Sequence, residues 1–303
     1  MRQFGAICSR NFKIYIRDAG SIFFSFLSML IVIGLMLIFL GDVTIDGVMS
    51  AVNQMPGRNP ENDLSVAKDI IFLWTTAGIL AINGATVTLA FYSNMIKDRT
   101  GNRLNSIMVM PIKRGTIVAG YIVSAWVVSA LMGLFALGII EVIGAIKGIA
   151  LFSFSTHIKI ILITLLNSLV YSSVMYFFAS IVKTEGAWSG FGIVVGTLVG
   201  FLGGIYFPIG SLSDSVATVV KCFPVIYGTS LYRKVMMDSL ETSFFEGCPD
   251  LVREIFDEAM GVNLSFCEKT LSLGEQVVIL LSIGGLFALL SVLYIRFSKK
   301  SDR

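Results

Sequence analysis

The sequence predicts an all-α integral membrane protein with six transmembrane helices, an N-terminal interfacial helix and an external re-entrant helix pair. Of its 303 residues, 55% are apolar and only 14% are charged, whereas a soluble domain carries about 25% charged residues. Six uncharged apolar runs are each long enough to cross about 30 Å of hydrocarbon. They do not alternate between apolar and polar residues, so helices are expected rather than barrel strands. The composition excludes the soluble, disordered, collagen-like and disulfide-scaffold classes.

The first element is an amphipathic helix over residues 2–18. Its two faces hold the basic residues Arg10, Lys13 and Arg17 and the apolar residues Phe4, Cys8, Phe12 and Tyr15. Such a helix is expected to lie on the inner leaflet, in contact with membrane lipid. The run that follows is too long for the apolar core of a signal peptide and has no cleavage site, so we expect an anchor.

The six predicted spans divide the charges unevenly between the two sides of the membrane. The spans are 21–40, 70–95, 117–140, 160–182, 187–207 and 276–295. The side that carries both termini holds 14 of the 23 Lys and Arg residues but only four of the 20 acidic residues. Basic loops stay in the cytoplasm. We therefore expect a multi-pass protein of the plasma membrane, of bacterial type, with cytoplasmic N- and C-termini.

Two further segments are expected on the external side beside the polar loop 41–69. From Pro208 to about Met237 the chain is too apolar for a solvated loop but is broken by Gly and Pro, which favours two short helices dipping into the outer leaflet. An acidic insert at 238–275 follows. Within it, Asp250 is expected to cap a helix that Gly261 ends, with four apolar side chains turned inward: Val252, Ile255, Phe256 and Ala259. The whole chain, 1–303, is expected to form one membrane domain.

Cysteine and histidine residues give little indication of chemistry. Cys8 and Cys222 show no metal-ligand spacing, and His157 has no evident partner ligand, so no metal site is predicted. Cys248 and Cys267 both fall in the external insert, where a disulfide could form or not. Enzyme motifs are absent, including a Walker A sequence, so no catalytic residues are predicted and the chain is not expected to hydrolyse ATP. The span interiors carry no charged residue, which disfavours an ion-coupled transporter. Energy for any uphill transport would come from another polypeptide.

The cytoplasmic loop between the second and third spans, 97–114, is the first segment with a functional pattern. It holds Asp98, Arg99, Gly101, Arg103 and Leu104, followed by an apolar run, Pro111 and the basic pair Lys113 and Arg114. A short amphipathic helix here could dock on a soluble partner, or the loop could simply fix the topology. This order of residues resembles the permease subunits of type-2 ABC exporters, in which the loop forms a coupling helix that contacts the ATPase. Asp98 stands where that family usually has Glu, and the Gly–Pro spacing is about one residue longer.

A second resemblance to that family follows the fifth span. The segments from Phe201 to Pro208 and from Phe223 to Tyr227, with Arg233 beyond them, are similar to its external re-entrant region, although Phe223 replaces the common Asn. The resemblance implies a permease that pairs with a second copy or a homologue and binds two copies of an ABC ATPase subunit. ATP and Mg²⁺ would be held by that ATPase and no cofactor by this chain. No nucleic-acid partner is expected.

Several polar, glycine and aromatic residues are candidates for packing or for a substrate path. Gly192, Gly196, Gly200 and Gly204 recur every four residues and predict close helix packing, within one protomer or across a dimer. Polar stripes occur on the second and fourth spans, where they could bond neighbouring helices or line a substrate path: Thr76, Asn83, Thr86, Thr164, Asn167, Ser168 and Tyr171. Phe201 and Phe207 are candidates for contact with substrate at an external gate. Arg233 and Lys234 are expected to anchor to lipid phosphate, or to contact the gate.

The sequence leaves three functions open. The first is the membrane permease of an ATP-driven exporter for an amphipathic or apolar substrate, such as a drug, antibiotic, peptide or lipid. The second is a membrane sensor or immunity protein that binds a ligand through the acidic insert without transport. The third is an ion-coupled secondary transporter.

Overall fold

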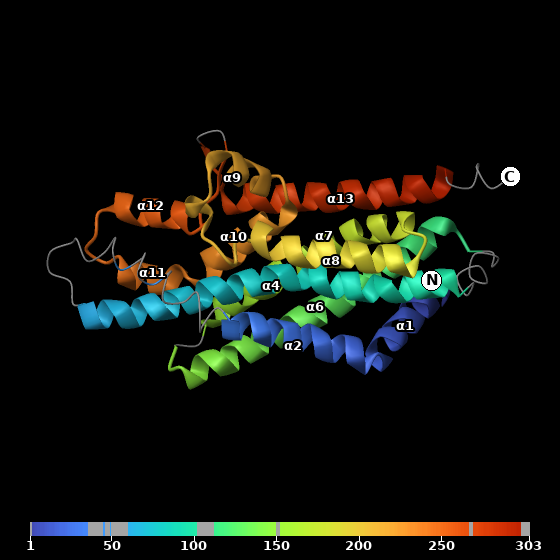
Figure 1. Cartoon of the computed structure of the whole chain (residues 1–303), viewed down its shortest axis with the longest axis horizontal. Coiled ribbons are helices and arrows are strands. Elements are labelled where there is room, and N and C mark those ends of the chain that lie inside the picture. Colours follow the sequence, from blue (N-terminus) through green and yellow to red (C-terminus); the bar gives the residue numbers. More distant parts are fainter. Residues whose placement is uncertain are drawn as a thin grey trace.

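The computed structural model describes residues 2–35, 45, 49, 60–101, 112–149, 152–266 and 269–297. Most of its helices run roughly along one long axis (Figure 1). The start of α1 (Arg2–Arg17) and the end of α13 (Leu273–Phe297) lie at the same end of the bundle, and α12 (Asp250–Ala259) lies toward the opposite end (Figure 1). We call these the α1 end and the α12 end.

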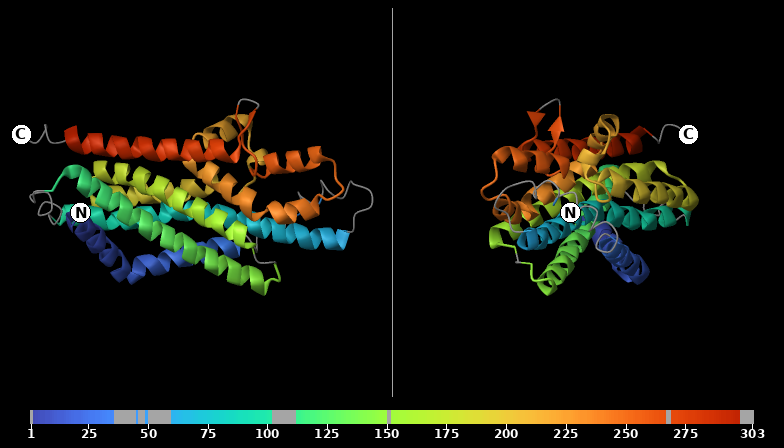
Figure 2. Two further views of the ribbon diagram at one scale, coloured as in Figure 1. Left: turned by 180° about the vertical axis from the view of Figure 1, so that it is seen from behind. Right: turned by 60° about the vertical axis from the view of Figure 1, so that its left-hand side comes forward.

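Helices α1 (Arg2–Arg17) and α2 (Ala19–Leu35) meet at Asp18 and form a V (Figure 2, left). Helix α1 has the predicted extent, and its apolar residues Ile7 and Tyr15 are buried. The described part of α2 has 17 residues. The end of the predicted span 21–40 lies outside the described residues, as do most of the predicted loop 41–69 and the loop residues Arg103, Leu104 and Pro111.

Among the described residues, five long helices are apolar enough to cross a membrane: α4 (Pro60–Thr100), α6 (Arg114–Ile146), α7 (Phe154–Ile181), α8 (Glu185–Leu202) and α13 (Leu273–Phe297). The apolar runs predicted each of them, and the first span of the predicted six falls on α2. Local sequence sets several of their ends. Proline opens α4, and the hydroxyls of Ser153 and Thr184 accept hydrogen bonds from the first turns of α7 and α8.

Helix α4 is the centre of the bundle. Of its most apolar stretch, 89% is buried inside the chain, against 17% for α8 and for α13. It packs against α6, α7, α8 and α10 (Pro224–Met236). Asn167 on α7 sits opposite one glycine of each neighbour: a Cβ added to Gly84 on α4 or to Gly228 on α10 would lie within 2.8 Å of the Asn167 amide. Because only 17% of the most apolar stretch is buried in α8 and in α13, these two helices leave much of their surface for lipid or for another chain.

Between α8 and α13 the chain forms the short elements η2 (Ile209–Ser211), α9 (Asp214–Lys221), α10 (Pro224–Met236), α11 (Asp238–Phe244) and α12 (Asp250–Ala259). An antiparallel pair, β1 (Ser265–Phe266) and β2 (Lys269–Thr270), follows with Ser265 opposite Thr270. Two helices thus occupy the segment 208–237, in which two short helices were predicted. Helix α10 begins with Pro224 and is almost wholly buried against α4, α7 and α13. The re-entrant position of α9 and α10 in a membrane stays a prediction.

Helix α12 shows how closely the sequence defines this segment. The prediction that Asp250 caps the helix is wrong, because Pro249 occupies the N-cap and Asp250 is the first helical residue. Gly261 follows the helix with φ +67°, as the predicted stop requires. Val252 and Phe256 pack on the core, as predicted. The prediction that Ile255 turns inward is wrong, because its side chain is 61% exposed. Helix α12 is covered on one side, where the Phe256 ring packs against Phe245. Cys267, the second cysteine of the disulfide that the sequence left open, lies outside the described residues.

Candidate functional site

The end of α4 is the first candidate site, and Asp98 is its most buried charged group. Asp98 is 6% exposed. Its Oδ2 atom accepts a hydrogen bond of 2.5 Å from Arg10 Nη2 on α1. Burial opposes the charge of Arg10, but the hydrogen bond and the attraction from Asp98 outweigh it, so the pKa of Arg10 is raised. This ion pair ties the interfacial helix to the base of the loop 97–114.

Arg99 ties the same end of α4 to the end of α7. Its Nη1 atom donates to the carbonyl oxygens of Ala179 and Ser180, at 3.1 and 3.2 Å, and also to that of Val182. The last carbonyls of a helix have no partner within the helix, so a guanidinium is well suited to this position. The next residue, Thr100, donates from Oγ1 to Glu185 Oε1, at 2.7 Å, at the start of α8.

The other flank of the loop is tied to α13. Lys113 precedes α6, and Arg114 Nη1 donates to the carbonyl of Ile295 at 2.9 Å. On the α4 side, the Gly101 amide donates to the Lys97 carbonyl at 3.0 Å, and a Cβ on Gly101 would lie 3.1 Å from that oxygen. We call the set Arg10, Asp98, Arg99, Thr100, Arg114 and Glu185 the α4 junction.

The α4 junction differs from the sequence interpretation in what its residues contact. Asp98, Arg99 and Arg114 were predicted as contacts to another subunit, and in the structure they bond to other helices of the same chain. The sequence interpretation missed Arg10, Thr100 and Glu185. A signal for Arg10 existed: it is a basic residue on a helix expected beside the loop, and Asp98 is the acid of that loop. Its partner lies 88 positions away, so sequence spacing alone could not pair them.

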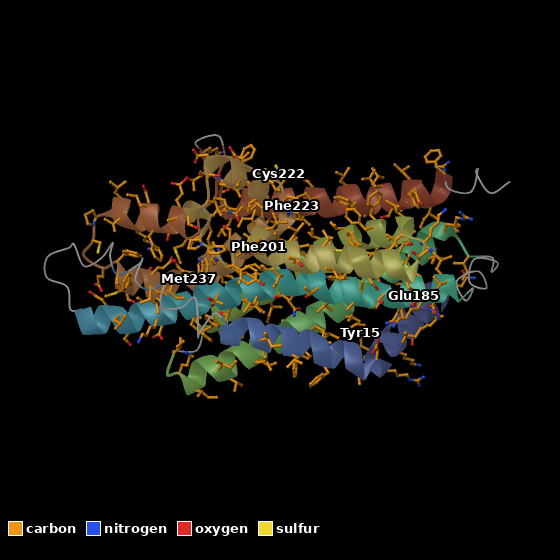
Figure 3. The ribbon with its side chains drawn as sticks, in the orientation of Figure 1. Tyr15, Glu185, Phe201, Cys222, Phe223 and Met237 are labelled. Carbon is orange, nitrogen blue, oxygen red and sulfur yellow. The ribbon has the colours of Figure 1, made fainter. Side chains whose placement is uncertain are left out.

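The second candidate site is an open cavity of about 650 Å³ near the far end of α8. We call it the α8 groove. Figure 3 shows Phe201 at this end of α8 and Glu185 at the opposite end, beside α4. The ring of Phe201 packs against Tyr206 and Phe207, with centroid distances of 4.9 and 6.4 Å. The groove is uncharged and is lined by Gly192, Ile193, Gly196, Thr197, Phe201, Tyr206 and Phe207.

The glycines that were predicted to form one face of α8 have different surroundings. Gly192 and Gly196 line the groove, and Gly200 lies near the end of the helix. A Cβ on Gly196 would meet nothing within 4 Å, whereas one on Gly200 would lie 2.6 Å from the Tyr206 ring. Gly204 does not belong to the helical face, because α8 ends at Leu202 and Gly204 has φ +61°. That prediction needs correction: Gly204 turns the chain after the helix, a conformation that glycine adopts at no steric cost.

The polar stripes of α4 and α7 lie away from the groove. Thr76, Asn83, Asn167 and Tyr171 are buried, and Thr86 is partly exposed. Asn167 Nδ2 donates to the Ala81 carbonyl at 2.8 Å, and the two threonine hydroxyls bond to carbonyls of their own helix. Their burial between helices favours the packing interpretation. Of the residues predicted for a substrate path, Phe201 and Phe207 are the two that line the α8 groove.

Four charged or titratable residues, Arg233, Lys234, His157 and Glu141, have partners that the sequence did not indicate. Arg233 is fully buried beside the Trp74 ring, so the prediction that it anchors to lipid phosphate is wrong. Lys234 is partly buried and donates to the Leu271 carbonyl at 3.1 Å. His157 forms an ion pair with Glu141, across the turn between α6 and α7. Both residues lie near that turn, which is the signal that could have paired them. Within the described residues, no group of three or more His, Cys, Asp or Glu is placed to hold a metal ion.

Comparison with known proteins places the chain in a family. The family model described as ABC-2 family transporter protein matches residues 52–295, which include α4 to α13 and both candidate sites apart from Arg10. A search of curated proteins found no match to the chain.

Proposed function

The chain belongs to the ABC-2 family of transporter membrane proteins, and from this membership we propose that it is the permease subunit of an ATP-driven exporter. A permease of this family is the membrane component of an ABC transporter, and this chain is a membrane protein with several apolar helices. The family implies an ABC ATPase as partner. In our proposal two copies of that separate subunit hold ATP and Mg²⁺, and this chain pairs with a second copy or a homologue.

The observation that carries the proposal is the α4 junction. A push on the loop 97–114 would reach the base of α4, which is bonded to α1 through Asp98, to α7 through Arg99 and to α8 through Thr100. The other side of the loop reaches α13 through Arg114. A loop that served only to fix the topology of the chain would need none of these bonds to other helices. Their arrangement supports a loop whose displacement is passed to most of the bundle.

The α8 groove supports an apolar or amphipathic substrate. Its lining is aromatic and uncharged, and α8 is little covered by the rest of the chain. In a paired permease the groove would face the partner or the substrate path, with Phe201 and Phe207 in contact with substrate. The charge distribution supports cytoplasmic termini in a bacterial plasma membrane. The α4 junction is then on the cytoplasmic side, where a soluble ATPase would bind.

The proposal predicts that Asp98→Asn disconnects ATP use from movement at the groove. An environment-sensitive fluorescent amino acid at Phe207 would report the groove in the complex purified from host membranes into nanodiscs. In the wild-type chain, ATP with vanadate should change its emission. Asp98→Asn should retain the ATPase but lose most of the change, because the charge-assisted bond to Arg10 is weakened.

Arg10→Ala should give the same defect, and the double variant should be no worse, because both changes remove one interaction. Lys13→Ala is the matched control: it removes an exposed cation from the same helix, one turn away. A normal ATP response in Asp98→Asn would contradict the role of the α4 junction. A wild-type chain that retains no ATP-hydrolysing subunit would contradict the proposed function itself.

A further inference from the structure

Arg233 on α10 is an unusual residue because a full positive charge is buried without a carboxylate. Its side chain is 0% exposed, and no carboxylate of the described residues forms an ion pair with it. A buried charge is costly unless hydrogen bonds and dipoles compensate for its lost hydration. The contacts that replace water around this guanidinium therefore define what the residue does.

The compensation comes from two carbonyls and one indole ring. Arg233 Nη1 donates to the Met260 carbonyl at 2.9 Å, and Nη2 donates to the Gly204 carbonyl at 2.7 Å. The guanidinium carbon lies 4.2 Å from the centroid of the Trp74 ring on α4. Trp74 Nε1 donates to the same Met260 carbonyl at 2.7 Å. The Met260 carbonyl thus accepts hydrogen bonds from both Arg233 and Trp74.

The two carbonyls belong to different parts of the molecule. Met260 follows α12, in the external acidic segment 238–275. Gly204 follows α8 and precedes Tyr206 and Phe207, which line the α8 groove. We call residues 203–208 the groove rim. One guanidinium therefore joins the end of the external segment to the groove rim, and the indole joins both to the central helix α4.

The backbone around the guanidinium is shaped for this contact. A Cβ on Gly261, which has φ +67°, would lie 3.0 Å from Arg233 Nη1. A Cβ on Gly210 in η2 would lie 2.7 Å from the Ala259 Cα atom, so η2 and the end of α12 meet backbone to backbone. Ser230 on α10 also donates to the Val262 carbonyl, at 2.6 Å. The end of α12, the groove rim and α10 form one closely packed unit.

We propose that Arg233 is a positioning residue that fixes the groove rim to the external segment, so that displacement of α12 moves the rim and changes access to the α8 groove. We call the hydrogen bonds from Arg233 to the Met260 and Gly204 carbonyls the Arg233 clasp. The importance of the groove for substrate rests on the proposed function, whereas the existence of the Arg233 clasp does not. Arginine is suited to this task because its planar fork bonds two acceptors in different directions while its face stacks on an aromatic ring. Lysine has all its donors on one nitrogen and no planar face to stack on the ring, so it could not reproduce this arrangement.

Hydrogen–deuterium exchange on the full chain in nanodiscs tests the clasp without any ATPase. In Arg233→Met, amide exchange should rise about tenfold or more in the groove rim and in 257–262 together, because each loses a charge-assisted hydrogen bond. Arg233→Lys should give a smaller rise in the same two segments. Exchange in α7 should stay at its wild-type rate. Lys234→Met is the matched control, since it removes the adjacent cation, which bonds Leu271 and not the rim.

The proposal is overturned if exchange in the groove rim stays at its wild-type rate in both Arg233 variants, or if it rises as much in Lys234→Met. It is also overturned if α7 exchange rises equally in Arg233→Lys, since the residue would then support the fold in general. Should Arg233→Met fail to fold, the Arg233→Lys pattern decides. Failure of the chain to retain an ATPase would contradict the proposed function and leave the exchange result unaffected.

Discussion

At the scale of single residues, buried charges mark the places where this chain departs from a uniformly apolar bundle. Asp98 has its cation, Arg233 has carbonyls and a ring, and Glu241 lies on α11 against other carboxylates. The sequence singled out Asp98 and Arg233 but not their partners, and it did not single out Glu241. Hydropathy reports the average environment of a window, whereas burial of one charge depends on residues tens or hundreds of positions away.

Glu241 gives the segment 238–275 a pH dependence. Its side chain is 2% exposed, with Oε2 3.7 Å from Arg253 Nη2. Arg253 also lies 3.3 Å from Asp238 and 4.0 Å from Asp257. Burial raises the pKa of Glu241 to about 8, with Asp257 and Asp238 adding to the rise and Arg253 opposing it. Burial also raises the pKa of Asp257 to about 6. The carboxyl groups of Glu241 and Asp257 therefore hold their protons more tightly in the folded chain than in the unfolded chain.

We expect the external segment to be more stable at pH 5.5 than at pH 8.5. The folded chain binds more protons than the unfolded chain above the usual pKa of Glu, so the free energy of unfolding falls as pH rises through about 8. Between pH 5.5 and the raised pKa of about 8, the loss of unfolding free energy should reach about 3 kcal/mol. Scanning fluorimetry should show the melting temperature falling over this range in the wild type and much less in Glu241→Gln. The exposed Glu254→Gln is the control, and an equally steep fall in Glu241→Gln would refute the assignment.

At the scale of elements, the sequence predicted helices well where local signals agree. Apolar runs located α4, α6, α7, α8 and α13, and proline, Ser and Thr set several of their ends. The stop at Gly261 was predicted because few other residues tolerate its φ. The end of α8 was placed too late, at 207 instead of Leu202, because the residues after it are equally apolar. The covered side of α12 was predicted only in part: Val252 and Phe256 are covered and Ile255 is not, because the cover comes from η2 and Phe245.

The candidate sites were predicted in part for the same reason. The loop 97–114 was recognised because its charges and proline stand out between two apolar spans. Phe201 and Phe207 were recognised from their position near Pro208. The groove that joins them to Gly192 and Gly196 was not predicted, because it depends on the chain reversing at Gly204 so that Tyr206 covers Gly200.

Filling the α8 groove should separate function from folding. A side chain on Gly196 meets open space, so Gly196→Leu should fold with a stability change within about 1 kcal/mol of the wild type. It should nevertheless block the groove and abolish ATP-driven emission changes at Phe207. Gly190→Leu is the matched control, because Gly190 lies on the same helix, also meets open space and does not line the groove. An unchanged response in Gly196→Leu would exclude the groove from the transport cycle.

At the scale of the whole molecule, α4 connects the two regions that carry our proposals. Asp98 lies in its last turn and Trp74, which holds Met260, lies toward its other end. Asp98 follows Trp74 by 24 positions on α4, which corresponds to about 36 Å along the helix axis. Because α4 is the most buried helix and packs against four long or buried neighbours, it would move as one body. Displacement at the α4 junction would then arrive at the Arg233 clasp and the groove rim.

The central claim, that energy enters through the loop 97–114 from a separate ATPase, is tested most directly by site-specific photocrosslinking. A photoreactive amino acid replaces Leu104 in the full chain, and the host membranes are irradiated with and without ATP. Our account predicts a covalent adduct to a protein that is labelled by azido-ATP. The same probe at Ile146, the exposed last residue of α6 and so at the opposite end of that helix from the loop, should give no such adduct. Adducts at Leu104 that contain only lipid or a second copy of this chain would contradict the claim.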